Sequence, residues 1–220
     1  MAILATHLNP APDLGTIATL ALADGCATHP VIARLTSAGA AGRDLADAVH
    51  ALCSVHGRLG DLFEQAAQRS VSGLDNRWMM LAIEGFASER AYLAHLTAAV
   101  GPLPSTPGQA ASDAAFAAQR HTFDMLARSD RAGCAIGAAL ALVIDWQAFR
   151  RILDAAAARV GAPIVAPQMP DAAEPSLLGG TGDASPAVVR AIAFGAQQTF
   201  AQHRGLCDLI EARAIARDQL

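Results

Sequence analysis

Apolar residues recur at alternating spacings of three and four along four long stretches of this 220-residue chain. In residues 41–69 the series is Leu45, Val49, Leu52, His56, Leu59 and Phe63. Similar series run from Met79 to Val100, through 112–161 and through 186–217. This spacing places apolar side chains on one face of an α-helix. Each such face needs a covering helix, so the pattern predicts an all-α fold.

Composition supports the same class. Hydrophobic residues make up 53% of the chain and are dominated by alanine, the best helix former, whereas aromatic residues make up only 5%. We expect one helical domain over 1–220: a four-helix bundle preceded by a helical appendage in residues 1–39. Residues 41–161 would supply three long helices, 162–185 a long loop, and 186–217 the fourth helix.

Capping residues and breakers set the expected helix ends. A first short helix would start after Asp13 and stop at Gly25, and a second would start at Pro30 and end before Gly39. The remaining signals are Ser72 and Asp75 before the second long helix, Gly101 after it, Ser112 before the third, Gly161 after it, and Ser185-Pro186 before the fourth. Residues 128–133 interrupt the third helix and mark either a kink or a new start.

The expected loop at 162–185 contains four prolines and is long for a compact domain, which is typical of functional lids and of crossover connections. Its Gly179-Gly180-Thr181-Gly182 run suggests a phosphate cradle. No predicted strand precedes that run, so we do not assign it.

Several function classes are excluded. All 16 basic residues are Arg, which rules out lysine Schiff-base chemistry and a Gly-Lys-Ser/Thr phosphate loop, and indicates a GC-rich bacterial genome. Singly scattered Arg and a net charge of −4 predict no nucleic-acid binding. The longest apolar run, Ala132–Ile144, is shorter than the about 20 residues that span a bilayer, so we expect a buried core helix and no membrane segment.

The four cysteines are isolated: Cys26, Cys53, Cys134 and Cys207. No pair has the Cys-x-x-Cys spacing, and each lies in an apolar helical context. They predict reduced, buried thiols and a cytoplasmic protein.

Each long helix carries one ionisable residue on its apolar face: His56, Glu89, Asp145 and His203. A buried ionisable side chain costs several kcal/mol unless it is paired, hydrogen-bonded or metal-bound. If the helices bring these positions level, two imidazoles and two carboxylates would meet in the bundle. They are the candidate ligand-binding or metal-binding residues.

This arrangement resembles that of ferritin-like carboxylate bundles over residues 41–217. The resemblance implies a divalent metal such as iron, manganese or zinc between the helices. The family motif is incomplete, because Tyr92 stands three residues after Glu89 where a His ligand is expected. Phe200 likewise stands where a Glu should precede His203.

Two other arrangements of these residues stay open. The four side chains would satisfy one another pairwise, for example His56 with a carboxylate, so that no metal site forms. Alternatively, the helical pairs Cys53/His56 and His203/Cys207 would converge on one tetrahedral zinc ion. In every case we expect His56 and His203 to be buried and to reach polar partners.

No complete catalytic motif is present, which argues against an enzyme. The first function hypothesis is a non-enzymatic bundle that acts by self-association or by binding a protein partner, through the small residues around Gly133, Gly137 and Ala138–Ala141. The second is a reduced ferritin-like bundle that binds a metal ion or small ligand at the four residues, with 162–185 as a cover.

Overall fold

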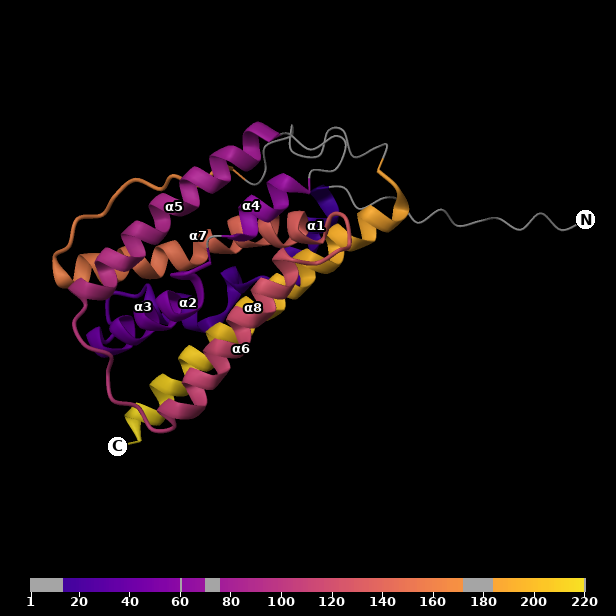
Figure 1. The fold of residues 1–220 in the computed structure, drawn as a ribbon. Helices are drawn as coiled ribbons and strands as arrows, with labels where there is room; N and C mark the ends of the chain where they lie inside the picture. Colours follow the sequence, from indigo (N-terminus) through magenta and orange to yellow (C-terminus); the bar gives the residue numbers. More distant parts are fainter. Residues whose placement is uncertain (1–13, 60, 70–75, 172–183, 220) are drawn as a thin grey trace, which may run out of the picture.

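The computed structural model describes residues 14–59, 61–69, 76–171 and 184–219 (Figure 1). These residues form helices and no strand, which confirms the all-α class. The elements are α1 (Leu14–Asp24), the 3-10 helix η1 (Cys26–Thr28), α2 (Pro30–Leu35), α3 (Gly42–His56), α4 (Asp61–Gln68), α5 (Asn76–Ala99), α6 (Gln109–Ala127), α7 (Cys134–Val160) and α8 (Pro186–Asp218).

The helix α7 is the axis of the fold and contacts every other α-helix (Figure 1). Every residue from Cys134 to Val143 is buried, as predicted for the apolar run that contains them. A helix that is apolar on all sides requires neighbours on all sides. The outcome is a central helix surrounded by shorter and longer ones, in place of the four long helices that we expected.

The helices α7 and α8 pack closely because glycines face the contact. A Cβ atom at Gly137 would lie 1.9 Å from the carbonyl oxygen of Ile192, and one at Gly195 would lie 2.0 Å from that of Cys134. Neither helix could approach so closely with a side chain at these positions. The small-residue surface around Gly137 therefore belongs to the core of the chain, so it does not support self-association.

Two of the predicted long helices are each broken in two. Residues 41–69 form α3 and α4, because α3 ends at His56 and Gly57 follows as its C-cap. Glycine is a poor helix former, and the sequence His-Gly-Arg-Leu-Gly places two glycines at this junction. Residues 112–161 form α6 and α7, with Gly133 at φ 99° before α7. Of the two alternatives for 128–133, the new start is therefore correct.

Other helix ends follow the sequence signals. Pro30 begins α2, Gly161 at φ 71° ends α7, and the Ser185 side chain accepts a hydrogen bond from the Val188 amide at the start of α8. The signals at Asp13, Ser72, Asp75 and 179–182 lie outside the described residues.

The described part of the long connection, residues 162–171, runs beside α5 (Figure 1). Trp78 Nε1 donates to the Asp171 carbonyl at 3.1 Å. A Cβ atom at Gly85 would lie 2.5 Å from the Gln168 carbonyl oxygen, so this glycine allows the segment to lie on the helix. Residues 162–171 therefore form a strap along α5.

Among the described helices, none combines the length and apolar character needed to cross a membrane.

Candidate functional site

The four candidate residues come from four different helices, as predicted. His56 is the last residue of α3, Glu89 lies in α5, Asp145 in α7 and His203 in α8. All four are at most 1% exposed. The predicted burial of both histidines is confirmed.

Asp145 and His203 form a direct pair between α7 and α8. Asp145 Oδ2 lies 2.9 Å from His203 Nδ1, and Asp145 Oδ1 accepts the backbone N–H of Cys26 at 3.0 Å. Because a carboxylate only accepts hydrogen bonds, Nδ1 of His203 carries the proton. The other ring nitrogen, Nε2, has no hydrogen-bond partner among the described residues, and it carries a lone pair when the ring is neutral.

His56 lies against His203, with the ring centroids 5.1 Å apart. Neither nitrogen of His56 has a hydrogen-bond partner in the described part of the chain, which corrects our expectation of a carboxylate partner. Asp145 is already engaged by His203. Burial, and secondarily the nearby His203, hold the pKa of His56 well below its usual range, so its ring is neutral at pH 7.

Aromatic rings surround the two imidazoles. Phe123 and Phe149 each contact both of them, at centroid distances of 5.0 to 5.9 Å, and Trp146 contacts His56 edge-on at 5.5 Å. Phenyl rings offer no hydrogen-bond partner to the imidazole nitrogens. The two imidazoles are thus polar groups enclosed by aromatic side chains.

Glu89 lies behind Trp146 and does not join the histidines. Its carboxylate accepts hydrogen bonds from Trp146 Nε1 at 3.0 Å, from Arg150 at 2.7 Å and from the backbone N–H of Gln168 at 3.2 Å. The structure therefore brings together Asp145, His203 and His56, and gives Glu89 a separate role: it ties the strap to α5 and α7.

Arg150 was not among the predicted site residues. Its guanidinium forms an ion pair with the Glu89 carboxylate. It also bonds Asp154 one turn along α7 and the Val165 carbonyl of the strap. An Arg/Asp pair four residues apart was the available sequence signal. The partner in α5 depends on how α5 and α7 dock, which the sequence does not specify.

Tyr92, which stands in the position of a missing ligand, donates its hydroxyl to Asp154 at 3.0 Å. The Arg150 guanidinium lies 4.4 Å from the centroid of its ring. Burial and the hydrogen bond to Asp154 raise the pKa of Tyr92 to about 12. Tyr92 is therefore neutral at pH 7 and belongs to the Glu89 network.

A cavity of about 500 Å³ lies between α5 and the strap. Glu89, Tyr92 and His95 line its helix side, and Pro163, Val165 and Gln168 line its strap side. The expected covering role of 162–185 thus has a physical counterpart beside Glu89. The cavity lining does not include His56 or His203.

The alternative zinc site, with Cys53, His56, His203 and Cys207 as its ligands, does not form in the structure. The side chain of Cys207 interacts with Cys26, and this hydrogen bond, with burial, strongly raises the pKa of the Cys26 thiol. Within the described ranges, no group of three or more His, Cys, Asp or Glu side chains is arranged to hold a metal ion. Among the described residues, the two imidazoles are therefore the candidate ligands that remain in the core.

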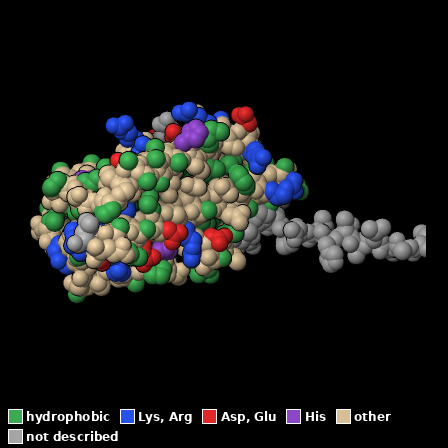
Figure 2. Space-filling view, turned by 90° about the horizontal axis from the view of Figure 1, so that it is seen from below, with side chains coloured by type: hydrophobic (Ala, Val, Ile, Leu, Met, Phe, Trp, Pro, Cys, Tyr) green, Lys and Arg blue, Asp and Glu red, His purple; other side chains and the backbone are tan. Residues whose placement is uncertain are grey.

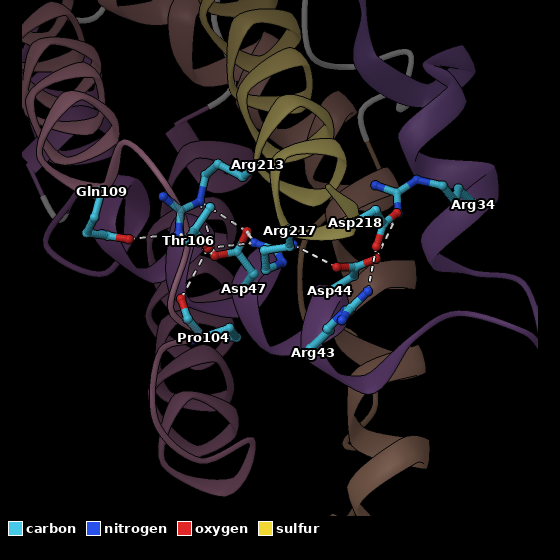
Figure 3. Close-up of polar contacts among 10 residues, drawn as sticks. All are labelled: Arg34, Arg43, Asp44, Asp47, Pro104, Thr106, Gln109, Arg213, Arg217 and Asp218. Atoms are coloured by element: carbon cyan, nitrogen blue, oxygen red, sulfur yellow. Dashed lines mark hydrogen bonds and ion pairs between the residues drawn. The ribbon is translucent and has the colours of Figure 1, made fainter. Parts of the chain in front are cut away.

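A further buried polar cluster was not predicted at all (Figure 3). Asp47 of α3 accepts hydrogen bonds from Arg213 at 2.6 Å and from Arg217 at 2.7 Å, and Arg217 also binds Asp44 at 2.7 Å. Thr106, between α5 and α6, accepts from both arginines. Asp44/Asp47 and Arg213/Arg217 each share a helix face, which was the one available signal.

A family model covers nearly all of these elements, from residue 21 to residue 218. The chain belongs to a family of unknown function, DUF6975. The match includes all four candidate residues and the Asp47 cluster. No curated protein and no solved structure matches the chain. The DUF6975 assignment therefore names no activity.

Proposed function

We propose that this DUF6975 protein is a binding protein that holds one divalent transition-metal ion at His56 and His203. The observation that supports this proposal is the set of three imidazole nitrogens, in two fully buried rings, that have no hydrogen-bond partner among the described residues. Each such atom costs about 1–3 kcal/mol relative to its hydrated state. Apolar residues of similar size would avoid that cost.

The orientation of His203 is typical of a metal ligand. Histidines that bind metals usually donate their other ring N–H to a carboxylate, as His203 does to Asp145. A cation at Nε2 would also compensate the negative charge of Asp145, whose carboxylate contacts the Cys26 backbone N–H and His203 but no arginine among the described residues.

The donor set limits which ion is expected. Neutral imidazoles suit zinc, iron and copper better than magnesium or calcium. Two protein ligands leave the other coordination positions to small external ligands, so we expect a weaker site than a four-ligand structural zinc centre. As in the ferritin-like hypothesis, a metal ion binds between the helices. Asp145, however, orients His203, and Glu89 binds the strap through Gln168.

Zinc titration by calorimetry, after chelator treatment of the purified protein, tests the proposal. We expect one site per chain that is lost in a His56→Leu, His203→Leu double variant and weakened about 10- to 100-fold in Asp145→Asn. His121→Leu is the matched control, because His121 is exposed on α6. Unchanged zinc binding in a folded double variant, or none in the wild type, would refute the proposal.

We propose that nucleic acids are not partners, because the arginines are scattered singly along the sequence and the net charge is −4. Figure 2 shows arginine side chains at several separate places on one face, with acidic and hydrophobic side chains between them. A nucleic-acid site needs a continuous basic surface to follow the phosphates. We propose a cytoplasmic, non-enzymatic role, because the cysteines are isolated and the sequence contains no complete catalytic motif.

Association with a protein partner is a second candidate function, favoured by the outer face of α1. The helix carries no charged residue before Asp24, and Ala18, Leu22 and Ala23 point outward, with Leu22 79% exposed. A surface helix that exposes apolar side chains and carries no charge over most of its length is typical of an interface. Light scattering at micromolar concentration tests the homodimer: we expect a dimer that Leu22→Glu converts to a monomer, and a wild-type monomer would contradict it.

A further inference from the structure

A second cavity, of about 370 Å³, opens where α3 ends against α5 and α6. It is lined by His50, Cys53, Ser54, Arg58, Thr97 and Arg120. All six residue types carry polar or ionisable side chains, and none is a carboxylate. In a chain with net charge −4, this composition makes the cavity locally cationic.

We propose that this cavity binds the phosphate group of a small phosphorylated metabolite, with Arg58 and Arg120 as its cationic ligands. Arg58 forms no hydrogen bond or ion pair with another described residue. Arg120 donates through Nη1 to the Ser54 carbonyl at 2.6 Å, which fixes its position and leaves its other N–H groups available. Guanidinium groups match phosphate oxygens in both charge and geometry.

Two nearby features oppose anion binding and are weaker than the two guanidinium charges. The C-terminus of α3 carries about half a negative charge, partly satisfied by the Arg120 hydrogen bond. Asp124 borders the adjoining smaller cavity together with Arg58 and Arg120. It forms no ion pair with either arginine in the described structure, so both remain available.

The size of the cavity indicates more than a free inorganic ion. Sites for small organic ligands occupy about 300–1,000 Å³, a range that includes this cavity and greatly exceeds one phosphate ion. Thr97 and Ser54 add hydroxyl groups at the edge, and the Cys53 side chain is partly exposed. This site is separate from the His56–His203 pair, and metal binding there does not affect the inference.

Calorimetric titration of the full chain with inorganic phosphate and with glycerol 3-phosphate, at constant ionic strength in chloride buffer, tests the site. Arg58→Gln should weaken binding of both at least tenfold. Arg128→Gln, which removes an exposed arginine from the end of α6 away from the cavity, should change it less than twofold. Asp124→Asn should tighten binding.

Tighter binding of glycerol 3-phosphate than of inorganic phosphate would show that the organic part occupies the cavity. Equal affinities would contradict the assignment to a phosphorylated metabolite, because the organic part would then add nothing to binding. Absence of binding by either probe at millimolar concentration, or equal losses in Arg58→Gln and Arg128→Gln, would overturn the inference. Arg58 is exposed and forms no hydrogen bond or ion pair with another described residue, so we expect its variant to fold.

Discussion

Near the C-terminal end of α8, Arg213 and Arg217 bind carboxylates of α3, whereas in the middle of the same helix His203 binds the Asp145 carboxylate and contacts the imidazole of His56. Both carboxylate oxygens of Asp47 accept charge-assisted hydrogen bonds. His56, at the other end of α3, has no hydrogen-bond partner among the described residues. The same pair of helices thus holds a cluster of paired charges and a pair of imidazoles with free nitrogens.

The difference separates a structural cluster from a candidate binding centre. Opposite charges at 2.6 to 2.7 Å compensate one another, and breaking such a cluster leaves a buried charge. Free imidazole nitrogens cost stability as they stand, and a ligand can recover that cost. Substitutions in the first cluster should therefore reduce stability most, and those in the second should reduce binding most.

The largest expected effect comes from Asp47→Ala, which leaves Arg213 and Arg217 buried without their shared carboxylate. We expect a loss of about 3–5 kcal/mol in the free energy of unfolding, measured by urea denaturation. Asp218→Ala is the control: Asp218 and its partner Arg43 are 61% and 55% exposed, so the loss should stay below about 1 kcal/mol. Equal losses would mean that burial does not set the strength of the Asp47 cluster.

The His56 position should respond in opposite ways to two substitutions. His56→Leu, in metal-free protein, should change the free energy of unfolding by less than about 1.5 kcal/mol or increase it, because a buried polar group is replaced by an apolar one of similar size. His56→Asp should destabilise the fold by several kcal/mol, because it buries a charge without a partner. A large loss in His56→Leu would indicate an unrecognised hydrogen bond.

Acid should weaken the metal-free protein through His56. The pKa of His56 is lowered in the folded state, so below about pH 6.5 the unfolded chain binds a proton that the folded chain does not. The stability is therefore fully present above about pH 6.5 and falls as the pH decreases toward the folded pKa. Urea denaturation between pH 5 and 8 should show this slope reduced in His56→Leu; an identical slope would exclude His56 as its source.

The smallest expected effect concerns the Glu89 network, where Tyr92 is the one tyrosine of the chain. Absorbance at 295 nm should give a titration midpoint at about 12 in the folded protein, and near the usual value of about 10 in urea. The linked stability is present below about pH 10 and is lost as the pH rises toward 12. Asp154→Asn should lower the midpoint of the folded protein. A variant with the same midpoint as the wild type would contradict the hydrogen bond from Tyr92 to Asp154.

The sequence predicted burial better than it predicted partners. The periodicity that placed His56 with Leu59 and Leu52 correctly assigned all three to the core. It also placed Glu89, Asp145 and His203 on apolar faces. Periodicity, however, shows on which face of its own helix a residue lies. It does not show which residues of a neighbouring helix lie at the same level. The separation of Glu89 from the histidines by Trp146 depends on how α5 docks on α7, which the pattern of α5 does not specify.

Helix junctions and polar networks were predicted less well for two physical reasons. The apolar spacing continues across Gly57, since Leu59 and Phe63 also face the core after the break, so periodicity alone does not reveal that α3 ends. Asp47 and Arg213 are 166 residues apart. Charged residues on a helix are usually solvated, and only the docking of α8 on α3 buries this pair.

The most direct test of the central claim is the ¹⁵N NMR spectrum of the histidine rings during titration of the metal-free protein with zinc. A nitrogen that binds a metal changes its chemical shift strongly. We predict that Nε2 of His203 and one nitrogen of His56 shift together and saturate at one equivalent of zinc, while the hydrogen bond from Nδ1 of His203 to Asp145 persists. Unchanged signals from both rings in excess zinc would contradict the account.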